Sequence, residues 1–123
     1  MPLIIGDWST RSGYAAGRVI ASDPTITAVF VANDQMALGV VKALADAGLR
    51  VPEDVSVVGF DDVDLCRWVN PQLTTVHQPL AGMASEATRL ALAMSRGESI
   101  AHRRVQLSAE LVVRESTAPP PVL

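Results

Sequence analysis

The sequence predicts an α/β protein built as a three-layer, doubly wound parallel sheet. Short apolar runs rich in β-branched residues alternate with amphipathic stretches of helical period, and this alternation calls for a parallel sheet with helices on both faces. The composition agrees, because 49% apolar and 19% charged residues in a chain of 123 suit one domain with a buried core.

The first half of the chain carries strand and helix signals in turn. We expect a strand at 3–5, a helix from Ser9 or Thr10 to about residue 21, a strand at 27–32, a helix at 34–47 and a strand at 55–59. Ser9, Thr10 and Asp34 suit helix N-caps, because their side-chain oxygens can accept a hydrogen bond from a free amide of the first turn. Gly48 suits the left-handed position that follows a helix.

The second half predicts a short helix at 63–69, a strand at 73–77, a long helix, and short extended pieces at 105–107 and 111–113. Pro79 suits the first turn of the long helix, since no amide is needed there. Apolar residues repeat at three- and four-residue steps from Leu80 to Met94, and we expect the stripe from Leu90 to Met94 to be core. Arg96-Gly97 ends this helix. A flexible tail is expected at 117–123, because consecutive prolines cannot continue a helix or central strand.

Charge and cysteine usage exclude several classes of protein. The net charge is −3 and the Lys and Arg residues form no cluster, so the chain is not expected to bind nucleic acid by itself. Cys66 is the only cysteine, which excludes an internal disulfide and favours a reducing compartment. No apolar run is long enough to span a bilayer and no secretory signal is present. We therefore expect a cytoplasmic location and no membrane partner.

No motif supports catalysis, a metal or a cofactor. Neither a P-loop nor a dinucleotide-binding glycine motif occurs, and no G-x-S-x-G elbow is present. His77 and His102 have no ligand-like spacing with Cys66 or with each other, so a zinc site is not expected. The acidic residues at 61, 62 and 64 lack the glycine and closing glutamate of a calcium loop. We predict a protein that is not an enzyme.

Two predicted parallel strands each end in a residue suited to a polar ligand. Asn33 follows the strand at 27–32, and Asp61 follows the strand at 55–59. In an open parallel sheet, ligands bind beyond the carboxyl ends of the strands. An amide donates and accepts hydrogen bonds, whereas an ionised carboxylate only accepts them. The pattern predicts a small polar ligand held by side-chain hydrogen bonds.

Four segments resemble the LacI/GalR family of bacterial transcription regulators, in the family's order: VANDQMALG, GLRVPEDVSVVGFDD, PQLTTVHQP and LVVREST. The resemblance runs from Gly6 to about Ser116 and is to the effector-binding core, which has the type I periplasmic-binding-protein-like fold. It implies a fragment of the C-terminal subdomain. Residues 1–116 would form a partial effector-binding domain, with 1–78 and 104–116 in the C-terminal subdomain and 79–103 as the crossover helix of the other subdomain.

The resemblance also implies what this sequence leaves out. DNA would be bound only through an N-terminal domain that is not in this chain. The family's strand order places a further strand between 3–5 and 27–32, so unpaired backbone and a gap in the core are expected here. We expect the chain either to pair strands with a second copy or to rearrange locally. A homodimer or higher oligomer is therefore expected, with no partner in the membrane.

Four residues match ligand-contacting positions of the sugar-binding family members: Trp8, Asn33, Asp61 and Gln78. Trp8 would stack its indole on a sugar ring, or else pack the first helix onto the sheet. Asn33 would bind hydroxyl groups or act as a turn residue, and Asp61 would accept hydrogen bonds from the ligand or cap the next turn. Gln78 would reach the ligand or tie the crossover. Leu80 stands where galactoside-binding members carry an aromatic residue, which weakens the case for a galactoside.

Other residues carry structural or interface predictions. Asp34 and Asp62 are expected to cap the helices that follow them. By resemblance, the dimer interface includes Leu38, Trp68 and Val69. An exposed Trp68 would be an anchor there, because aromatic residues are enriched at interfaces; the alternative is burial within the same subunit.

Together, these observations predict the effector-sensing and dimerisation part of a LacI-type DNA-binding transcription regulator. The effector is a small molecule, and a sugar is favoured over a purine. It would shift a conformational equilibrium through its differential affinity for two states. Two alternatives are a periplasmic-type sugar-binding protein without DNA binding and a stand-alone dimerisation module. A doubly wound enzyme would need a phosphate loop or an acid–base set, and the sequence contains neither.

Overall fold

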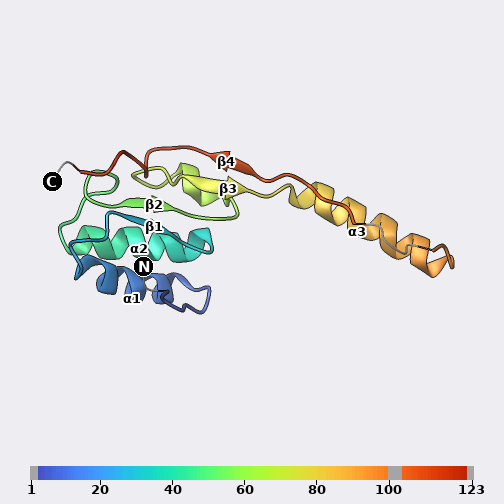
Figure 1. Ribbon diagram of the computed structural model, residues 1–123, viewed down its shortest axis with the longest axis horizontal. Helices are drawn as coiled ribbons and strands as arrows, with labels where there is room; N and C mark the ends of the chain where they lie inside the picture. Colours follow the sequence, from blue (N-terminus) through green and yellow to red (C-terminus); the bar gives the residue numbers. More distant parts are fainter. Residues whose placement is uncertain (1–2, 100–103, 122–123) are drawn as a thin grey trace. The chain divides into compact units, whose positions relative to one another are not determined.

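The computed structural model describes residues 3–99 and 104–121, and the chain divides into two compact units. Unit 1 comprises Met1–His77 and Leu111–Leu123, and unit 2 comprises Gln78–Glu110. The elements, drawn in Figure 1, are α1 (Thr10–Ala21), β1 (Ala28–Phe30), α2 (Asp34–Asp46), β2 (Ser56–Val58), the 3₁₀ helix η1 (Asp64–Arg67), β3 (Thr75–His77), α3 (Leu80–Ser95) and β4 (Glu110–Val112). The predicted α/β alternation is confirmed, although the strands are shorter than expected.

The sheet of unit 1 is built on parallel pairing. β1 and β2 pair in register along their whole length. Two isolated parallel bridges, Val58 with Thr74 and Asp61 with His77, extend the pairing from β2 towards β3. β4 pairs with β3. Because β1, β2 and β3 run in the same direction, the residues that follow them lie at one edge of the sheet.

The core of unit 1 lies around α2, which is covered on two sides as predicted. Its fully buried side chains come from α2, β2, η1 and the segment just before β3, and include Val40, Leu44, Val57, Cys66 and Leu73. In Figure 1, α1 lies beyond α2 as seen from β1 and β2. The helical face of α2 that turns away from the strands is therefore covered by α1.

Two glycines allow α1 and α2 to approach closely. A Cβ on Gly13 would lie 2.1 Å from the carbonyl oxygen of Met36, and a Cβ on Gly39 would lie 2.1 Å from the carbonyl oxygen of Thr10. Both neighbours are backbone atoms, which cannot move aside as a flexible side chain can. The contact between the two helices therefore depends on the absence of a side chain at both positions.

The predicted strand at 3–5 is wrong. Leu3 and Ile5 are 89% and 88% exposed, and only Ile4 packs against the core. A strand needs a hydrogen-bonded neighbour, and within the described residues β1 pairs with β2 alone. Beside β1 lies an apolar cavity of about 480 Å³, lined by residues of α1, β1 and α2 and by Leu3 and Ile4. The gap expected at this place is present.

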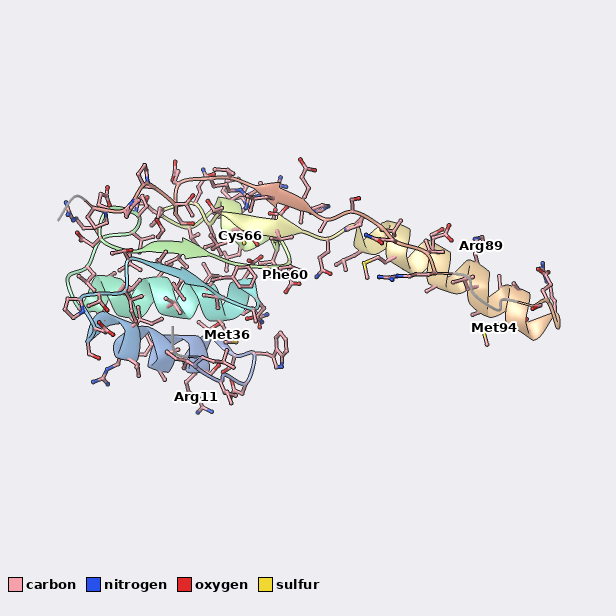
Figure 2. All side chains as sticks on the ribbon, viewed as in Figure 1. Arg11, Met36, Phe60, Cys66, Arg89 and Met94 are labelled. Atoms are coloured by element: carbon pink, nitrogen blue, oxygen red, sulfur yellow. The ribbon has the colours of Figure 1, made fainter. Side chains whose placement is uncertain are left out.

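Unit 2 consists of α3 and the chain that returns towards β4. Pro79 precedes α3, and Gly97 has the positive φ of 73° that suits a residue after a helix, so the predicted ends are confirmed. The expectation that the stripe from Leu90 to Met94 is core is wrong, because Ala93 is the only described α3 residue that is buried. Figure 2 shows Arg89 and Met94 on this helix. Within unit 2 there is too little chain to cover the stripe.

Two other predictions fall on unit 2. The extended piece at 105–107 is not a strand, whereas the piece predicted at 111–113 corresponds to β4. α3 lies within the range 79–103 that was predicted to hold a helix, and the assignment of this helix to the other subdomain as a crossover stays a prediction. Residues 100–103, including His102, lie outside the described residues.

Candidate functional site

The carboxyl ends of β1 and β2 bring three of the four predicted ligand residues into one region of unit 1. The side-chain Nδ2 of Asn33, three residues after the end of β1, donates to the Trp8 carbonyl oxygen at 3.0 Å. The next amide, that of Asp34, donates to the Phe60 carbonyl oxygen at 2.9 Å, beside Asp61. One side-chain and one backbone hydrogen bond thus tie the three segments carrying Trp8, Asn33 and Asp61 to one another.

Trp8 is held on a fixed turn with its indole exposed. Its φ of 70° is rare for a bulky residue, and the next residue, Ser9, N-caps α1. Asp7 Oδ1 accepts hydrogen bonds from the Ser9 amide at 3.0 Å and from Ser9 Oγ at 2.5 Å. Hydrogen bonds from Ser9 and Ser12 lower the pKa of Asp7 to about 2. Trp8 is 64% exposed, which argues against the alternative that it packs the first helix onto the sheet.

Asn33 is the N-cap of α2, so the cap role predicted for Asp34 is wrong. The backbone of Asn33 is extended, and its Oδ1 accepts from the Met36 amide at 3.0 Å. Asp34 already lies in the first helical turn, where its side chain points elsewhere. Asn33 is 8% exposed, with its amide group engaged by Met36 and Trp8. Contact of Asn33 with a ligand stays a prediction.

Asp61 has a backbone conformation that few residues adopt. Its φ is 117°, its amide donates to the Val76 carbonyl oxygen at 3.0 Å, and the residue is half-buried. Asp62, which follows, also has a positive φ, of 55°. Such conformations persist where surrounding contacts fix them, and they gather at ligand sites. The rest of the site must therefore hold these two residues in place.

Asp34 is a buried anchor of the site. Its Oδ1 accepts from Thr75 Oγ1 at 2.5 Å, and its Oδ2 accepts from the Val63 amide at 2.9 Å. It thus joins the start of α2 to β3 and to the loop after β2. Burial and the hydrogen bond with Asp34 raise the pKa of the nearby Cys66 thiol to about 12, so this thiol is an inert core residue and not a nucleophile.

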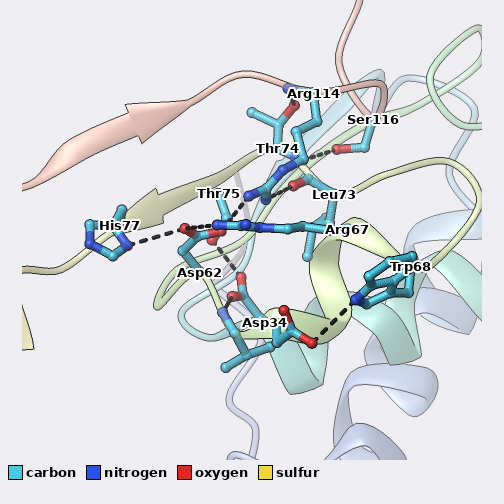
Figure 3. Close-up of polar contacts among 12 residues, drawn as sticks. Asp34, Asp62, Arg67, Trp68, Leu73, Thr74, Thr75, His77, Arg114 and Ser116 are labelled. Atoms are coloured by element: carbon cyan, nitrogen blue, oxygen red, sulfur yellow. Dashed lines mark hydrogen bonds and ion pairs between the residues drawn. The ribbon is translucent and has the colours of Figure 1, made fainter.

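Asp62 lies at the centre of a charged cluster (Figure 3), so its predicted cap role is wrong. Arg114 Nη2 donates to Oδ1 at 2.5 Å, and His77 Nδ1 lies 3.1 Å from Oδ2. Arg67 Nη2 lies 3.9 Å from Oδ2, and the Asp62 side chain is 4% exposed. Burial alone would raise the pKa of Asp62, but the hydrogen bonds from Arg114 and His77 and the charge of Arg114 outweigh it and lower the pKa. No side chain caps η1, which follows Val63.

Sequence reasoning missed Arg114 and Ser116 as site-supporting residues. Arg114 Nη1 also donates to the Leu73 carbonyl oxygen at 2.8 Å. Ser116 Oγ accepts from the Thr74 amide at 2.8 Å and donates to the Val57 carbonyl oxygen at 2.6 Å, joining β2 and β3 to the carboxyl-terminal segment. Both residues lie in the LVVREST segment, so the signal was present, but nothing in the sequence showed their partners.

The remaining predicted residues lie elsewhere. Gln78 begins unit 2, and its carbonyl oxygen accepts from the Leu80 amide at 2.8 Å. Trp68 is 77% exposed, with its Nε1 donating to Asp64 Oδ2 at 3.2 Å, so it is not buried within its own subunit. Leu38 and Val69 are half-buried against the core of unit 1.

Residues 3–99 and 104–121 contain no group of three or more His, Cys, Asp or Glu side chains arranged to hold a metal ion. None of the helices in these residues is long and apolar enough to cross a membrane. None of Trp8, Asn33 and Asp61 lines the apolar cavity beside β1. The predicted ligand residues gathered here are therefore the exposed Trp8, the buried Asn33 and the half-buried Asp61, and their contact with a ligand stays a prediction.

Known proteins resemble this chain in sequence and in structure. The profile of the periplasmic binding protein-like domain family matches residues 5–117. The HTH-type transcriptional repressor PurR of Pasteurella multocida is 37% identical over 112 residues, which cover 90% of this chain and 34% of that protein. The lac repressor dimer bound to operator and an anti-inducer has a TM-score of 0.84 at 36% identity, covering 93% of this chain and 40% of the other. A complex of the transcriptional regulator CelR with cellobiose has a TM-score of 0.84 at 41% identity, covering 90% and 34%.

The chain belongs to the family of periplasmic binding protein-like domains, in the form found in LacI-type transcription regulators. It spans about a third of the length of the curated relatives it matches. The predicted fold class and the predicted family are therefore confirmed.

Proposed function

We propose that this chain is the carboxyl-terminal part of the effector-binding core of a LacI-type transcription regulator, and that it takes part in sensing a sugar. The gathering of Trp8, Asn33 and Asp61 beyond β1 and β2 carries this proposal. An exposed indole offers a flat apolar surface for the C–H face of a sugar ring, and the amide and carboxylate offer hydrogen bonds to hydroxyls. Gln78 is the fourth proposed contact.

The proposed mechanism is binding without chemistry. Effector would favour one conformation of the regulator by its differential affinity, and DNA would be bound by a separate domain. Such a regulator works in the cytoplasm, where its operator is. No residue is assigned a catalytic role, because Cys66 is inert and the carboxylates of Asp34 and Asp62 are fully engaged in the fold.

The test is thermal unfolding of the chain with cellobiose, lactose, ribose, sucrose and a set of nucleobases. A sugar that binds the folded state raises the free energy of unfolding by about 2.7 kcal/mol when its concentration is a hundredfold above its Kd. The unfolding midpoint rises as a result. Asp61→Asn should abolish the rise, whereas Asp64→Asn, which removes an exposed carboxylate nearby, should keep it. A rise in the midpoint with nucleobases alone would mean that the effector is a nucleobase and not a sugar. No rise with any compound would contradict the proposal.

We further propose that η1 lies at a dimer interface, with Trp68 as its anchor. Trp68 and Leu65 are exposed large apolar residues on and beside η1, and Leu38 and Val69 are also half-exposed. Aromatic anchors of this kind dominate the energy of interfaces. Trp68→Ala should shift the chain from dimer to monomer in light scattering, with the fold unchanged by circular dichroism. A wild-type monomer at concentrations well above micromolar would contradict the interface.

A further inference from the structure

Asp62 makes side-chain contacts beside both stretches of chain that connect unit 1 to unit 2. The chain passes from unit 1 to unit 2 after His77 and returns at Leu111. His77 Nδ1 lies 3.1 Å from Asp62 Oδ2, at the last residue before the first connection. Arg114 Nη2 donates to Asp62 Oδ1 at 2.5 Å, three residues after the second connection. One carboxylate, with one oxygen for each partner, therefore ties both connections to the loop that follows β2.

The same carboxylate follows directly on the proposed ligand residue Asp61. The backbone of Asp61 is fixed on one side by its own hydrogen bond to Val76 and on the other by Asp62. Both residues have positive φ, a conformation that is unfavourable for a non-glycine residue and needs support from its surroundings. The buried ion pair of Asp62 with Arg114 supplies that support, since its side chains are only 4% and 9% exposed.

We propose that Asp62 is a positioning residue whose one carboxylate holds the backbone of Asp61 and both connections. Ligand binding at Asp61 would then change the protection of amides at the connections against hydrogen exchange. The link to ligand rests on the proposed function, whereas the hold on the connections does not. Arg67 is not part of it, because its guanidinium is 3.9 Å away and its side chain is 61% exposed.

Amide hydrogen exchange of the free chain, followed by NMR, tests the hold on the connections. The Asp61 amide, bonded to Val76, reports the first connection, and the Arg114 amide, bonded to Thr74 Oγ1 at 2.9 Å, reports the second. Asp62→Asn should speed exchange of both by about tenfold or more, because a hydrogen bond to a buried charge is lost. The Val31 amide, bonded to Val58 at 2.8 Å, is the internal reference and should not change.

Two further variants make this test selective. Asp64→Asn removes a carboxylate two residues away and should change neither reporter. His77→Gln alters a residue whose side chain is 51% exposed, and it should speed exchange of the Asp61 amide alone. The hold is overturned if Asp62→Asn leaves both reporters within about twofold, or if the reference amide speeds up equally. If Asp62→Asn does not fold, an unchanged Asp61 amide in His77→Gln overturns it.

Cellobiose, the sugar in the CelR complex, is the probe for the link to ligand. Saturating cellobiose should slow exchange of the Arg114 amide in the wild type and should not do so in Asp62→Asn. Binding that leaves the Arg114 amide unchanged in the wild type overturns the link. Absence of binding by every sugar in the panel counts against the proposed function instead, and the exchange rates of the free chain still decide whether Asp62 holds the connections.

Discussion

Units 1 and 2 contain helices of similar length but very different burial. α2 in unit 1 buries seven of its thirteen residues, whereas α3 in unit 2 buries only Ala93 among its sixteen. Both sequences are apolar enough to predict a core helix. The difference teaches that an apolar stripe specifies a helix, while burial of the stripe depends on what the rest of the chain supplies.

The sharpest test of this difference is truncation of one leucine in each helix. Leu44→Ala on α2 removes a fully buried side chain and should destabilise unit 1 by about 2–5 kcal/mol. Leu92→Ala on α3, which is 51% exposed, should change stability by no more than about 0.5 kcal/mol. Urea unfolding measures both, and the buried Cys66 thiol reports the opening of unit 1 by its labelling rate. Equal losses at the two positions would mean that α3 is packed in solution.

A glycine pair tests the close approach of α1 and α2. Gly39→Ala would force a Cβ against the Thr10 carbonyl and should cost about 3 kcal/mol, at the upper end for overpacking. Gly82→Ala in α3 meets only the Leu107 side chain at 3.5 Å, and it should stabilise the helix by about 0.5–1 kcal/mol. Circular dichroism of α3 and chemical unfolding of unit 1 check the two signs. A neutral Gly39→Ala would show that the helices can move apart.

Acid sensitivity separates a buried carboxylate from an exposed one. The pKa of Asp62 is lowered in the fold, so its contribution is present above the ordinary aspartate pKa and is lost as pH falls through the lowered value. Asp62→Asn should cost about 1.5–3 kcal/mol at neutral pH and reduce this acid loss. Glu86→Gln on α3 should leave the pH profile unchanged, because the Glu86–Arg89 pair is exposed and screened. Parallel unfolding curves over the acid range measure both, and an unaltered profile in Asp62→Asn would contradict the assignment.

The sequence by itself determined the order of the elements and most of the helix ends, whereas the strands are shorter than it predicted. The alternation of apolar runs predicted every helix and every strand that unit 1 contains. It also predicted a strand at 3–5 that the structure does not have. Ser9, Gly48, Pro79 and Gly97 marked helix ends correctly, because capping and left-handed conformations depend on a few neighbouring residues. The positions of Asn33 and Asp61 beyond the ends of β1 and β2 followed from the same local patterns, whereas no strand precedes Trp8.

Only the tertiary structure decided which partners the polar residues take. Asp34 and Asp62 both read as caps, yet Asp34 binds Thr75 and Asp62 binds Arg114, which is 52 residues away along the chain. Leu3 to Ile5 read as a strand, yet no neighbouring strand pairs with it among the described residues. Capping, turns and helical period are local properties, whereas a buried ion pair or a strand requires a second segment, and its place is set by packing of the whole unit.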